Sequence, residues 1–355
     1  MFRILFLLLL LFMAIAGGGG YWLYKYRLTA PLPIFNEIHY TVESNVTLSE
    51  VARDLMEKDL LDYPTALAWV NLARFQKRAH LIKAGEYRVP VGTTPQQLLD
   101  IMISGKTIQY TLTIPEGWNF YQLMTAVRTH PHLIQTLNGV NSDDAIMEKL
   151  GWPKQHPEGR FYPDTYLFPT RTTDVEFLQR AYKVMQAKLK AAWERRDRDL
   201  PLKSPDEALV LASLIEKETA VAEERPLIAG VFIRRLKKNM LLQTDPTVIY
   251  ALGKTFDGNI RKQDLKTDSP YNTYINKGLP PTPIAMPGKP ALEAAVNPKP
   301  GDTLFFVAKG DGSHYFSKTY EEHECAVIEY QLKAKSPNRY HSQCKVYPSC
   351  AACRS

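Results

Sequence analysis

Two glutamates, Glu216 and Glu218, directly follow an apolar run at residues 208–215. In a helix their side chains point about 200° apart and cannot share a face. Glu218 falls on the stripe of Leu211 and Leu214, where apolar neighbours would destabilise its ionised form and raise its pKa. A raised pKa suits a general acid that works near neutral pH. We therefore predict Glu218 as such an acid; the alternative is that it is only the first polar residue as the helix emerges.

The helix that carries Glu218 belongs to a largely helical stretch. Four helices are predicted there, one capped by Asp174, one opened by a Ser204–Glu207 capping box with Pro205 in its first turn, and others starting at about Pro226 and at Asp245. Residues 269–300 are rich in Pro, Gly, Asn and Tyr, too irregular for an element and too long for a plain connector. This pattern favours an ordered functional loop, followed by a hairpin around residues 303–316.

Closer to the N-terminus, three units at residues 46–55, 92–102 and 117–123 each combine a turn with an amphipathic helix. Strand-like segments at 85–89 and 110–114 precede the second and third units. The first two units resemble the LysM pattern of peptidoglycan-binding modules, although such units are also common in other α+β proteins. The sequence as a whole predicts an α+β fold.

The N-terminal segment from Ile4 to Tyr24 contains no charged residue, and its 21 residues in a helix would span a bilayer core of about 30 Å. Aromatic and then basic residues follow it, as at a membrane interface. We expect an uncleaved membrane anchor; the rival interpretation is a signal peptide cleaved after Ala14–Ala16.

The composition also limits the classes of function. A chain of 355 residues is long enough for two globular domains. Its net charge of +7 includes Arg3, Lys25 and Arg27 in the first 35 residues, so the remainder is only weakly basic. A dedicated nucleic-acid binder would concentrate more positive charge on one face, and we expect no nucleic-acid partner.

All four cysteines lie near the C-terminus: Cys325, Cys344, Cys350 and Cys353. A Cys-x-x-Cys pair near another thiol can bind zinc, but no His-bearing partner motif has the right spacing. With either an anchor or a signal peptide, the rest of the chain lies beyond the membrane, and we expect a bacterial envelope protein. In that oxidising compartment we favour disulfides over free or lipidated thiols and over a metal site.

Several motifs resemble those of the endolytic murein transglycosylase (MltG/YceG-like) family and follow that family's order. They lie at residues 83–87, 158–166, 212–220, 242–250, 269–274, 278–281 and 312–316. The resemblance extends from the anchor to about Lys333, and a set of motifs in order is more specific than any one of them.

The resemblance implies a membrane-anchored lytic transglycosylase that cleaves the β-1,4 bond between N-acetylmuramic acid (MurNAc) and N-acetylglucosamine (GlcNAc) inside nascent glycan strands. It would leave 1,6-anhydroMurNAc ends and terminate glycan elongation. The family's catalytic glutamate corresponds to Glu218. One carboxyl suffices because the C6 hydroxyl of the substrate is the nucleophile, whereas ordinary glycosidases use two carboxyls.

The resemblance also implies no cofactor and no metal. The expected partners are peptidoglycan glycan strands, peptidoglycan synthases (penicillin-binding proteins) and the membrane. The expected location is the bacterial inner membrane, crossed once, with the catalytic domain in the periplasm.

The domain organisation is expected to have seven parts. They are a cytoplasmic stub at 1–3, an anchor at 4–24, a linker at 25–38, a LysM-like glycan-binding subdomain at 39–115, a connecting α+β region at 116–158, a mixed α+β catalytic domain at 159–333 and a basic cysteine-containing tail at 334–355.

Four residues are expected to contact sugars, because amide and phenol groups bond hydroxyls and acetamides while aromatic faces stack on sugar rings: Gln243, Tyr271, Asn272 and Tyr274. The Thr-Asp-Pro setting of Asp245 fits a helix N-cap as well as a substrate contact. His314 either orients a neighbour or is a turn histidine. We expect the stretch 269–300 to form one wall of a glycan cleft opposite the helix of Glu218.

Two other functions stay open at this level. One is a non-catalytic scaffold, in which the LysM-like units bind the cell wall and Glu218 is structural. The other is a hydrolase that uses two carboxyls, Glu218 and Asp245, and releases reducing ends in place of anhydro ends.

Overall fold

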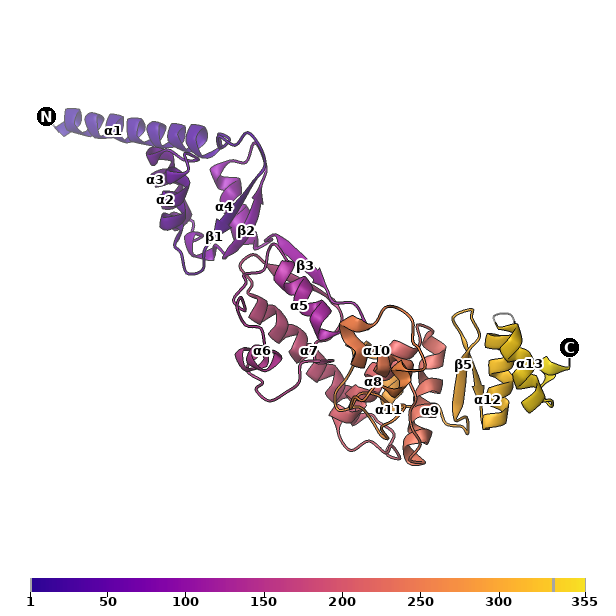
Figure 1. The fold of residues 1–355 in the computed structure, drawn as a ribbon. Coiled ribbons are helices and arrows are strands. Elements are labelled where there is room, and N and C mark those ends of the chain that lie inside the picture. Colours follow the sequence, from indigo (N-terminus) through magenta and orange to yellow (C-terminus); the bar gives the residue numbers. More distant parts are fainter. Residues whose placement is uncertain (1, 334–335, 355) are drawn as a thin grey trace. The chain divides into compact units, whose positions relative to one another are not determined.

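The computed structural model describes residues 2–333 and 336–354, without the side chains of residues 2–10, 23 and 337 (Figure 1). The chain forms two compact units, Met1–Thr111 with Leu167–Thr172, and Leu112–Tyr166 with Thr173–Ser355. Helices and three two-stranded sheets make up the described part, which confirms the α+β class. The division between the units falls within β3 (Gln109–Thr113) and β4 (Thr165–Pro169), which form one of these sheets.

The N-terminal helix α1 covers Phe2–Leu23 and continues into a π-helical turn at Tyr24–Leu28. Residues 4–10 of the expected anchor lie outside the residues whose side chains the structure describes. Among the residues that it does describe, no helix is both long and apolar enough to cross a membrane.

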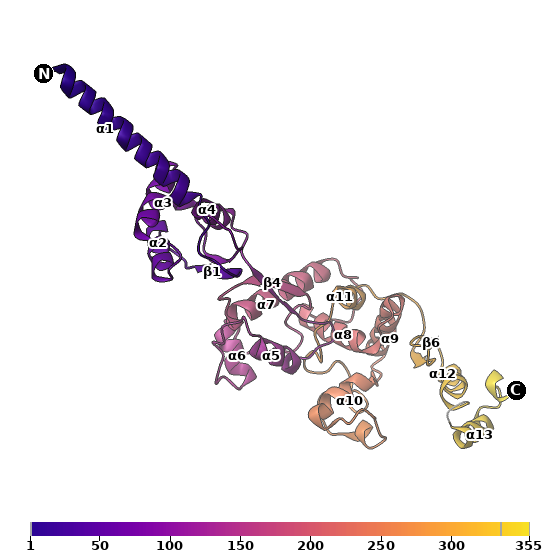
Figure 2. The same ribbon diagram turned by 90° about the horizontal axis from the view of Figure 1, so that it is seen from above.

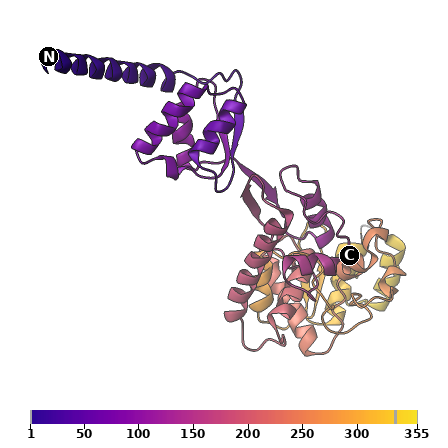
Figure 3. The same ribbon diagram turned by 90° about the vertical axis from the view of Figure 1, so that its left-hand side faces the viewer.

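The rest of the first unit is built on an antiparallel ribbon of β1 (Ile38–Val42) and β2 (Gly85–Val89). Three helices pack around this ribbon: α2 (Leu48–Glu57), α3 (Tyr63–Phe75) and α4 (Pro95–Ser104) (Figure 3). Their shared core surrounds the fully buried Trp69 and Tyr87. Thr47 and Thr94 cap α2 and α4 in complete capping boxes, because each is followed three residues later by Glu or Gln.

The second unit is mainly helical. Its helices are α5 (Phe120–Thr129), α6 (Asp143–Leu150), α7 (Asp174–Glu194), α8 (Pro205–Glu218), α9 (Arg225–Lys237), α10 (Asp245–Leu252), α11 (Lys289–Val296), α12 (Tyr320–Val327) and α13 (Pro337–Val346). A hairpin of β5 (Phe305–Ala308) and β6 (His314–Ser317) confirms the predicted one. Short helical turns lie at Ala79–Leu81 in the first unit and, in the second, at Ala222–Glu224, Gly253–Thr255, Asp264–Lys266, Ile328–Leu332 and Ala351–Cys353.

Helix α8 is the central element of this unit. Every residue of its apolar run 208–215 is buried, and its neighbours include α7, α9, α10 and α11 (Figures 1 and 2). Such a helix can carry a carboxyl into an apolar interior only at its end, where the polar residues begin.

Local details differ from the prediction at three places. Thr173, not Asp174, caps α7; the carboxylate of Asp174 is fully buried and accepts the backbone N–H of Leu137 at 2.9 Å. Ser204 caps α8, but Glu207 accepts the N–H of Lys203 at 2.7 Å, so the capping box is incomplete. The stretch 269–300 contains a regular helix, α11, which its flanking Pro and Gly residues concealed in the sequence.

The predicted preference for disulfides is confirmed. Cys325 of α12 is bonded to Cys350, and Cys344 of α13 is bonded to Cys353. The two bridges and a small apolar cluster around Ile328 and Leu332 hold the C-terminal segment together.

The loop before α11 is fastened to α8 by buried hydrogen bonds. The Ser213 hydroxyl donates to the carbonyl of Val210 at 2.7 Å and accepts the N–H of Ile284 at 3.0 Å. Glu216 accepts the N–H of Gly288 at 2.9 Å. These bonds set the position of the loop relative to the helix of Glu218.

Replacement of Ser213 by Ala should lower the free energy of unfolding by about 1–3 kcal/mol, because it leaves the buried N–H of Ile284 without an acceptor. Urea denaturation of the full chain measures this loss. The control, Ser342→Ala at an exposed position of α13, should change stability by less than about 0.5 kcal/mol. Equal stability of the two variants would show that the Ser213 bond does not fasten the loop.

Candidate active site

Glu218 is the last residue of α8, since Thr219 takes up extended backbone (φ −144°, ψ 138°). Its side chain lines an open cavity of about 480 Å³ in the second unit. The start of α10, the β5–β6 hairpin and α12 supply other parts of the cavity wall. The helix thus delivers one carboxyl from the apolar core to a solvent-accessible space.

The surroundings of Glu218 favour its protonated form. Burial, with a smaller contribution from the nearby charge of Asp245, raises the pKa of Glu218 to about 7. A hydrogen bond from the Thr244 hydroxyl and the positive charge of Arg235 act in the opposite direction. A carboxyl with a pKa near 7 can both give and take a proton at neutral pH.

Glu216 points elsewhere, as the helical spacing predicts. In addition to the N–H of Gly288, it contacts the buried Arg225, whose Nη2 lies 3.5 Å from its Oε1. Burial raises the pKa of Glu216 as well, but its carboxylate is occupied in joining α8, α9 and the loop before α11. Of the two carboxyls, only Glu218 lines the cavity.

Glu218 is hydrogen-bonded to Thr244, which two other buried threonines, Thr247 and Thr273, hold in place. Thr244 donates its hydroxyl to Glu218 Oε1 and its N–H to Thr273 Oγ1, the latter at 3.1 Å. Thr247 donates its hydroxyl to the carbonyl of Thr244 at 2.7 Å and lies 2.9 Å from Thr273 Oγ1. Because Oε1 accepts from Thr244, the other oxygen of Glu218 is the one left to carry a transferable proton. Thr244 is not among the residues predicted from the sequence, although its place directly before Asp245-Pro246 is a signal for it.

Several predicted residues do gather around Glu218. Gln243, Asp245, Tyr274 and His314 all line the same cavity. Asp245 is the first residue of α10 and its side chain forms no cap; its Oδ1 accepts the Tyr274 hydroxyl at 2.5 Å. Gln243 has left-handed backbone (φ 50°), a strained conformation of a kind that often occurs at functional sites. Contact of these residues with substrate stays a prediction.

Two of the predicted residues, Tyr271 and Asn272, do not line this cavity. Asn272 is fully buried; its amide donates to the carbonyls of Leu265 and Thr267, and its oxygen accepts the N–H of Tyr274. No polar group of its side chain is left for a sugar. Tyr271 lies outside the cavity, with its ring 4.9 Å from that of Tyr250 and its hydroxyl bonded to Thr282 at 2.8 Å. Both residues shape the loop that presents Tyr274.

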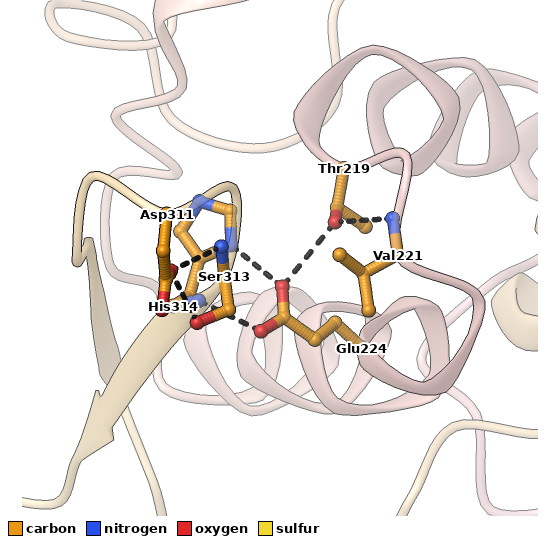
Figure 4. A network of polar contacts seen from close by, with 6 residues as sticks. All are labelled: Thr219, Val221, Glu224, Asp311, Ser313 and His314. Carbon is orange, nitrogen blue, oxygen red and sulfur yellow. Dashed lines mark hydrogen bonds and ion pairs between the residues drawn. The ribbon is translucent and has the colours of Figure 1, made fainter.

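His314 contacts the carboxylate of Glu224. Its Nδ1 lies 2.7 Å from Glu224 Oε2, and its backbone N–H donates to Glu224 Oε1 at 2.7 Å (Figure 4). Glu224 also accepts the hydroxyl of Thr219 at 3.2 Å, and that hydroxyl accepts the N–H of Val221 at 3.0 Å (Figure 4). The network joins the hairpin to the residue that follows Glu218. These contacts fit a role of His314 in orienting a neighbour, and that role stays a prediction.

Aromatic side chains that the sequence does not predict as site residues form one wall of the cavity. Phe305 stacks on His323 with ring centres 5.3 Å apart, and Tyr320 packs edge-on against Phe305 at 5.9 Å. Tyr320 keeps 57% of its surface exposed at the cavity. Such faces suit the stacking of sugar rings. Within the part of the chain that the structure describes, no cluster of three or more His, Cys, Asp or Glu side chains could hold a metal ion.

Fold and site together define an α+β protein in which a partly buried acid of raised pKa lines a polar and aromatic cavity. The sequence of residues 40–329 matches the model of the YceG-like family, and the chain belongs to that family. A protein of *Bacillus subtilis* (strain 168) named endolytic murein transglycosylase is 33% identical over 309 residues, which cover 82% of this chain and 84% of that protein.

Other relatives agree with this assignment. A protein of *Streptococcus pneumoniae* serotype 2 (strain D39) with the same name is 29% identical over 356 aligned positions, covering 87% of this chain but 62% of that longer protein. The crystal structure of a yceG-like protein from *Listeria monocytogenes* superposes with a TM-score of 0.52 at 32% identity, over 81% of this chain and 98% of that one.

Replacement of Thr244 by Val should move the basic limb of the pH–rate profile to higher pH. The lost hydrogen bond favours the ionised form of Glu218, so its removal raises a pKa that is already about 7. The maximal rate should also fall by about tenfold or more, since the acid is no longer held in place. Thr244→Ser keeps the hydroxyl and should restore the wild-type limb. An unshifted limb in Thr244→Val would exclude the proposed role of Thr244.

Replacement of Asn272 and replacement of Tyr274 should have different effects, the first on thermal stability and the second on turnover. Asn272→Ala should lower the melting temperature, because it leaves buried carbonyls without donors. Tyr274→Phe should leave the melting temperature nearly unchanged but lower turnover, because Asp245 loses its partner at the cavity. Thermal unfolding and turnover per folded molecule measure both. A stable but inactive Asn272→Ala variant would contradict the structural role given to Asn272.

Proposed function

We propose that this chain cleaves the β-1,4 bond between MurNAc and GlcNAc inside nascent glycan strands, forms 1,6-anhydroMurNAc ends and thereby terminates strand elongation. The family match and the relatives named endolytic murein transglycosylase support the assignment of the chain as a peptidoglycan lytic transglycosylase. The observation that carries the finer proposal is the carboxyl of Glu218, which lines an open cavity and has its pKa raised to about 7.

The chemistry needs only this carboxyl. Protonated Glu218 gives its proton to the bridging oxygen as the bond from that oxygen to C1 of MurNAc breaks, and the bonding electrons leave with GlcNAc O4. The carboxylate then accepts the proton of the MurNAc C6 hydroxyl, whose oxygen forms the new bond to C1. A pKa near 7 suits a group that acts first as acid and then as base.

The second candidate is a hydrolase that uses Glu218 and Asp245. It is favoured by the presence of Asp245 in the same cavity. Against it, one oxygen of Asp245 is occupied by the Tyr274 hydroxyl, which leaves this carboxylate less free to activate a water. The products distinguish the two reactions.

We also propose that residues 4–24 anchor the protein in the bacterial inner membrane as a single span, with the catalytic unit in the periplasm. The two disulfides support an oxidising compartment. Residues 39–115 would act as a LysM-like glycan-binding subdomain, and peptidoglycan synthases would supply the nascent strands.

Glu218→Gln should abolish cleavage of purified uncross-linked glycan, because the amide has no transferable proton. Mass spectrometry of the wild-type products should show anhydro ends; reducing ends would favour the hydrolase, and the absence of any cleavage would favour the scaffold. Glu216→Gln is the matched control and should retain most of the activity.

A folding control accompanies this experiment. The folded-state pKa of Glu218, about 7, lies above its ordinary value of 4.5, so its contribution to stability is lost as the pH rises through that window. At pH 8 the uncharged Gln variant should therefore melt no lower than the wild type. An active Glu218→Gln variant would refute the assignment of the acid.

A further inference from the structure

A second cavity, of about 860 Å³, opens beside the end of α8. Lys217 lines this cavity, whereas the next residue, Glu218, lines the first one. Successive residues at the start of α10 also line different cavities: Asp245 lines the first cavity and Pro246 lines the second. The two cavities therefore lie next to each other, separated by the end of α8 and the start of α10.

The second cavity is rich in hydrogen-bond donors. The side-chain oxygens of Asn119 and Gln122 each accept the other residue's backbone N–H at 2.9 Å, in the capping box of α5. Among the residues that the structure describes, their NH₂ groups have no acceptor and are left as donors at the cavity wall. The capping box thus fixes the positions of two amide donors.

Three cations line the same cavity: Arg128, Lys217 and Lys254. Lys217 donates to the carbonyl of Gly117 at 3.3 Å, and Lys254 lies 4.6 Å from the ring centre of Tyr121. Within residues 2–333 and 336–354, none of the three cations forms an ion pair with a carboxylate. Their charge is available to a ligand.

The carboxylates of the cavity do not balance this charge. Glu158 is 3% exposed, and its oxygens accept the N–H of Phe120 and the hydroxyl of Tyr250, both at 3.0 Å. Burial raises the pKa of Glu158 to about 7, so it carries less than a full charge at neutral pH. Asp143 is the exposed carboxylate. The cavity therefore fits a ligand with carboxylates and other acceptors.

We propose that this second cavity binds the carboxylate-bearing peptide stem of the MurNAc residue that reacts at Glu218. The inference rests on the proposed function. In peptidoglycan the stem is attached through the lactyl group on C3 of MurNAc, and C1 of that same sugar is the reacting atom. The stem must therefore leave the strand close to Glu218, where the second cavity opens. Its carboxylates and carbonyls complement Lys217, Lys254 and the free amides.

Further sugar units are the other possible occupant. Unsubstituted sugars carry no charge, and their binding would depend little on the lysines. They would instead use Tyr121, which keeps 62% of its surface exposed. A comparison of strands with and without stems separates the two occupants.

The experiment compares two substrates for the full chain: uncross-linked strands that bear peptide stems, and the same strands stripped of stems by an amidase. Wild-type protein should cleave the stem-bearing strands with a higher kcat/KM. Lys254→Gln should reduce this preference about tenfold, mainly through KM, as expected for the loss of one charge-assisted hydrogen bond. Lys203→Gln, exposed in the same unit and outside both cavities, is the matched control and should keep the wild-type preference.

The outcomes are distinct. Equal cleavage of both substrates by the wild type, or an equal loss on both in Lys254→Gln, would overturn the proposal and favour further sugars in the cavity. A preference that Lys254→Gln leaves unchanged would also overturn it. Absence of cleavage of either substrate by the wild type would refute the proposed function itself.

Discussion

The carboxyl of Glu218 must be dry enough to hold a proton near neutral pH and open enough to reach a substrate. Its place at the last residue of α8 meets both requirements. The buried run 208–215 brings the end of the helix into the apolar core, and the negative end of the helix dipole further disfavours an ionised carboxyl there. The helix ends at Glu218, since Thr219 takes up extended backbone, and the side chain of Glu218 lines an open cavity. The packing of the second unit follows from this constraint.

Keeping the carboxyl of Glu218 out of water costs stability, and hydrogen bonds from neighbouring side chains reduce that cost. The hydroxyl of Thr244 gives the buried carboxyl a partner, and Thr247 and Thr273 hold Thr244 in turn. The left-handed backbone of Gln243 adds local strain directly before this threonine. Strain and burial at one place are tolerated because the loops around them are fastened elsewhere, by Ser213 and Glu216.

The sequence predicts those features that depend on residues near each other in the chain, and it does not predict those that depend on tertiary contacts. Glu218 was identified because helical periodicity is local and relates side-chain direction directly to spacing. Tyr271, Asn272 and Tyr274 look alike as candidate sugar contacts, yet only Tyr274 reaches the cavity, because side-chain direction in an irregular loop is set by tertiary contacts. Thr244 is also set by a tertiary contact, because its hydroxyl donates to the carboxyl of Glu218, 26 residues away in the sequence. No local pattern predicts that hydrogen bond. Helix α11 was hidden by the Pro and Gly residues around it.

The electrostatics of Glu218 also constrain where the protein can recognise negative charge. A cation beside an acid stabilises the ionised form and lowers its pKa, so lysines lining the first cavity would weaken the acid. In the described part of the chain, Arg235 is the one Lys or Arg residue that lines this cavity, and carbonyls of Leu304 and Leu242 occupy its guanidinium at 2.7 and 2.9 Å. Lys217, although adjacent to Glu218 in sequence, points into the other cavity. Helical geometry thus lets successive residues serve opposite electrostatic needs: one cavity stays nearly free of positive charge for proton transfer, and the neighbouring one can attract carboxylates without lowering the pKa of the acid.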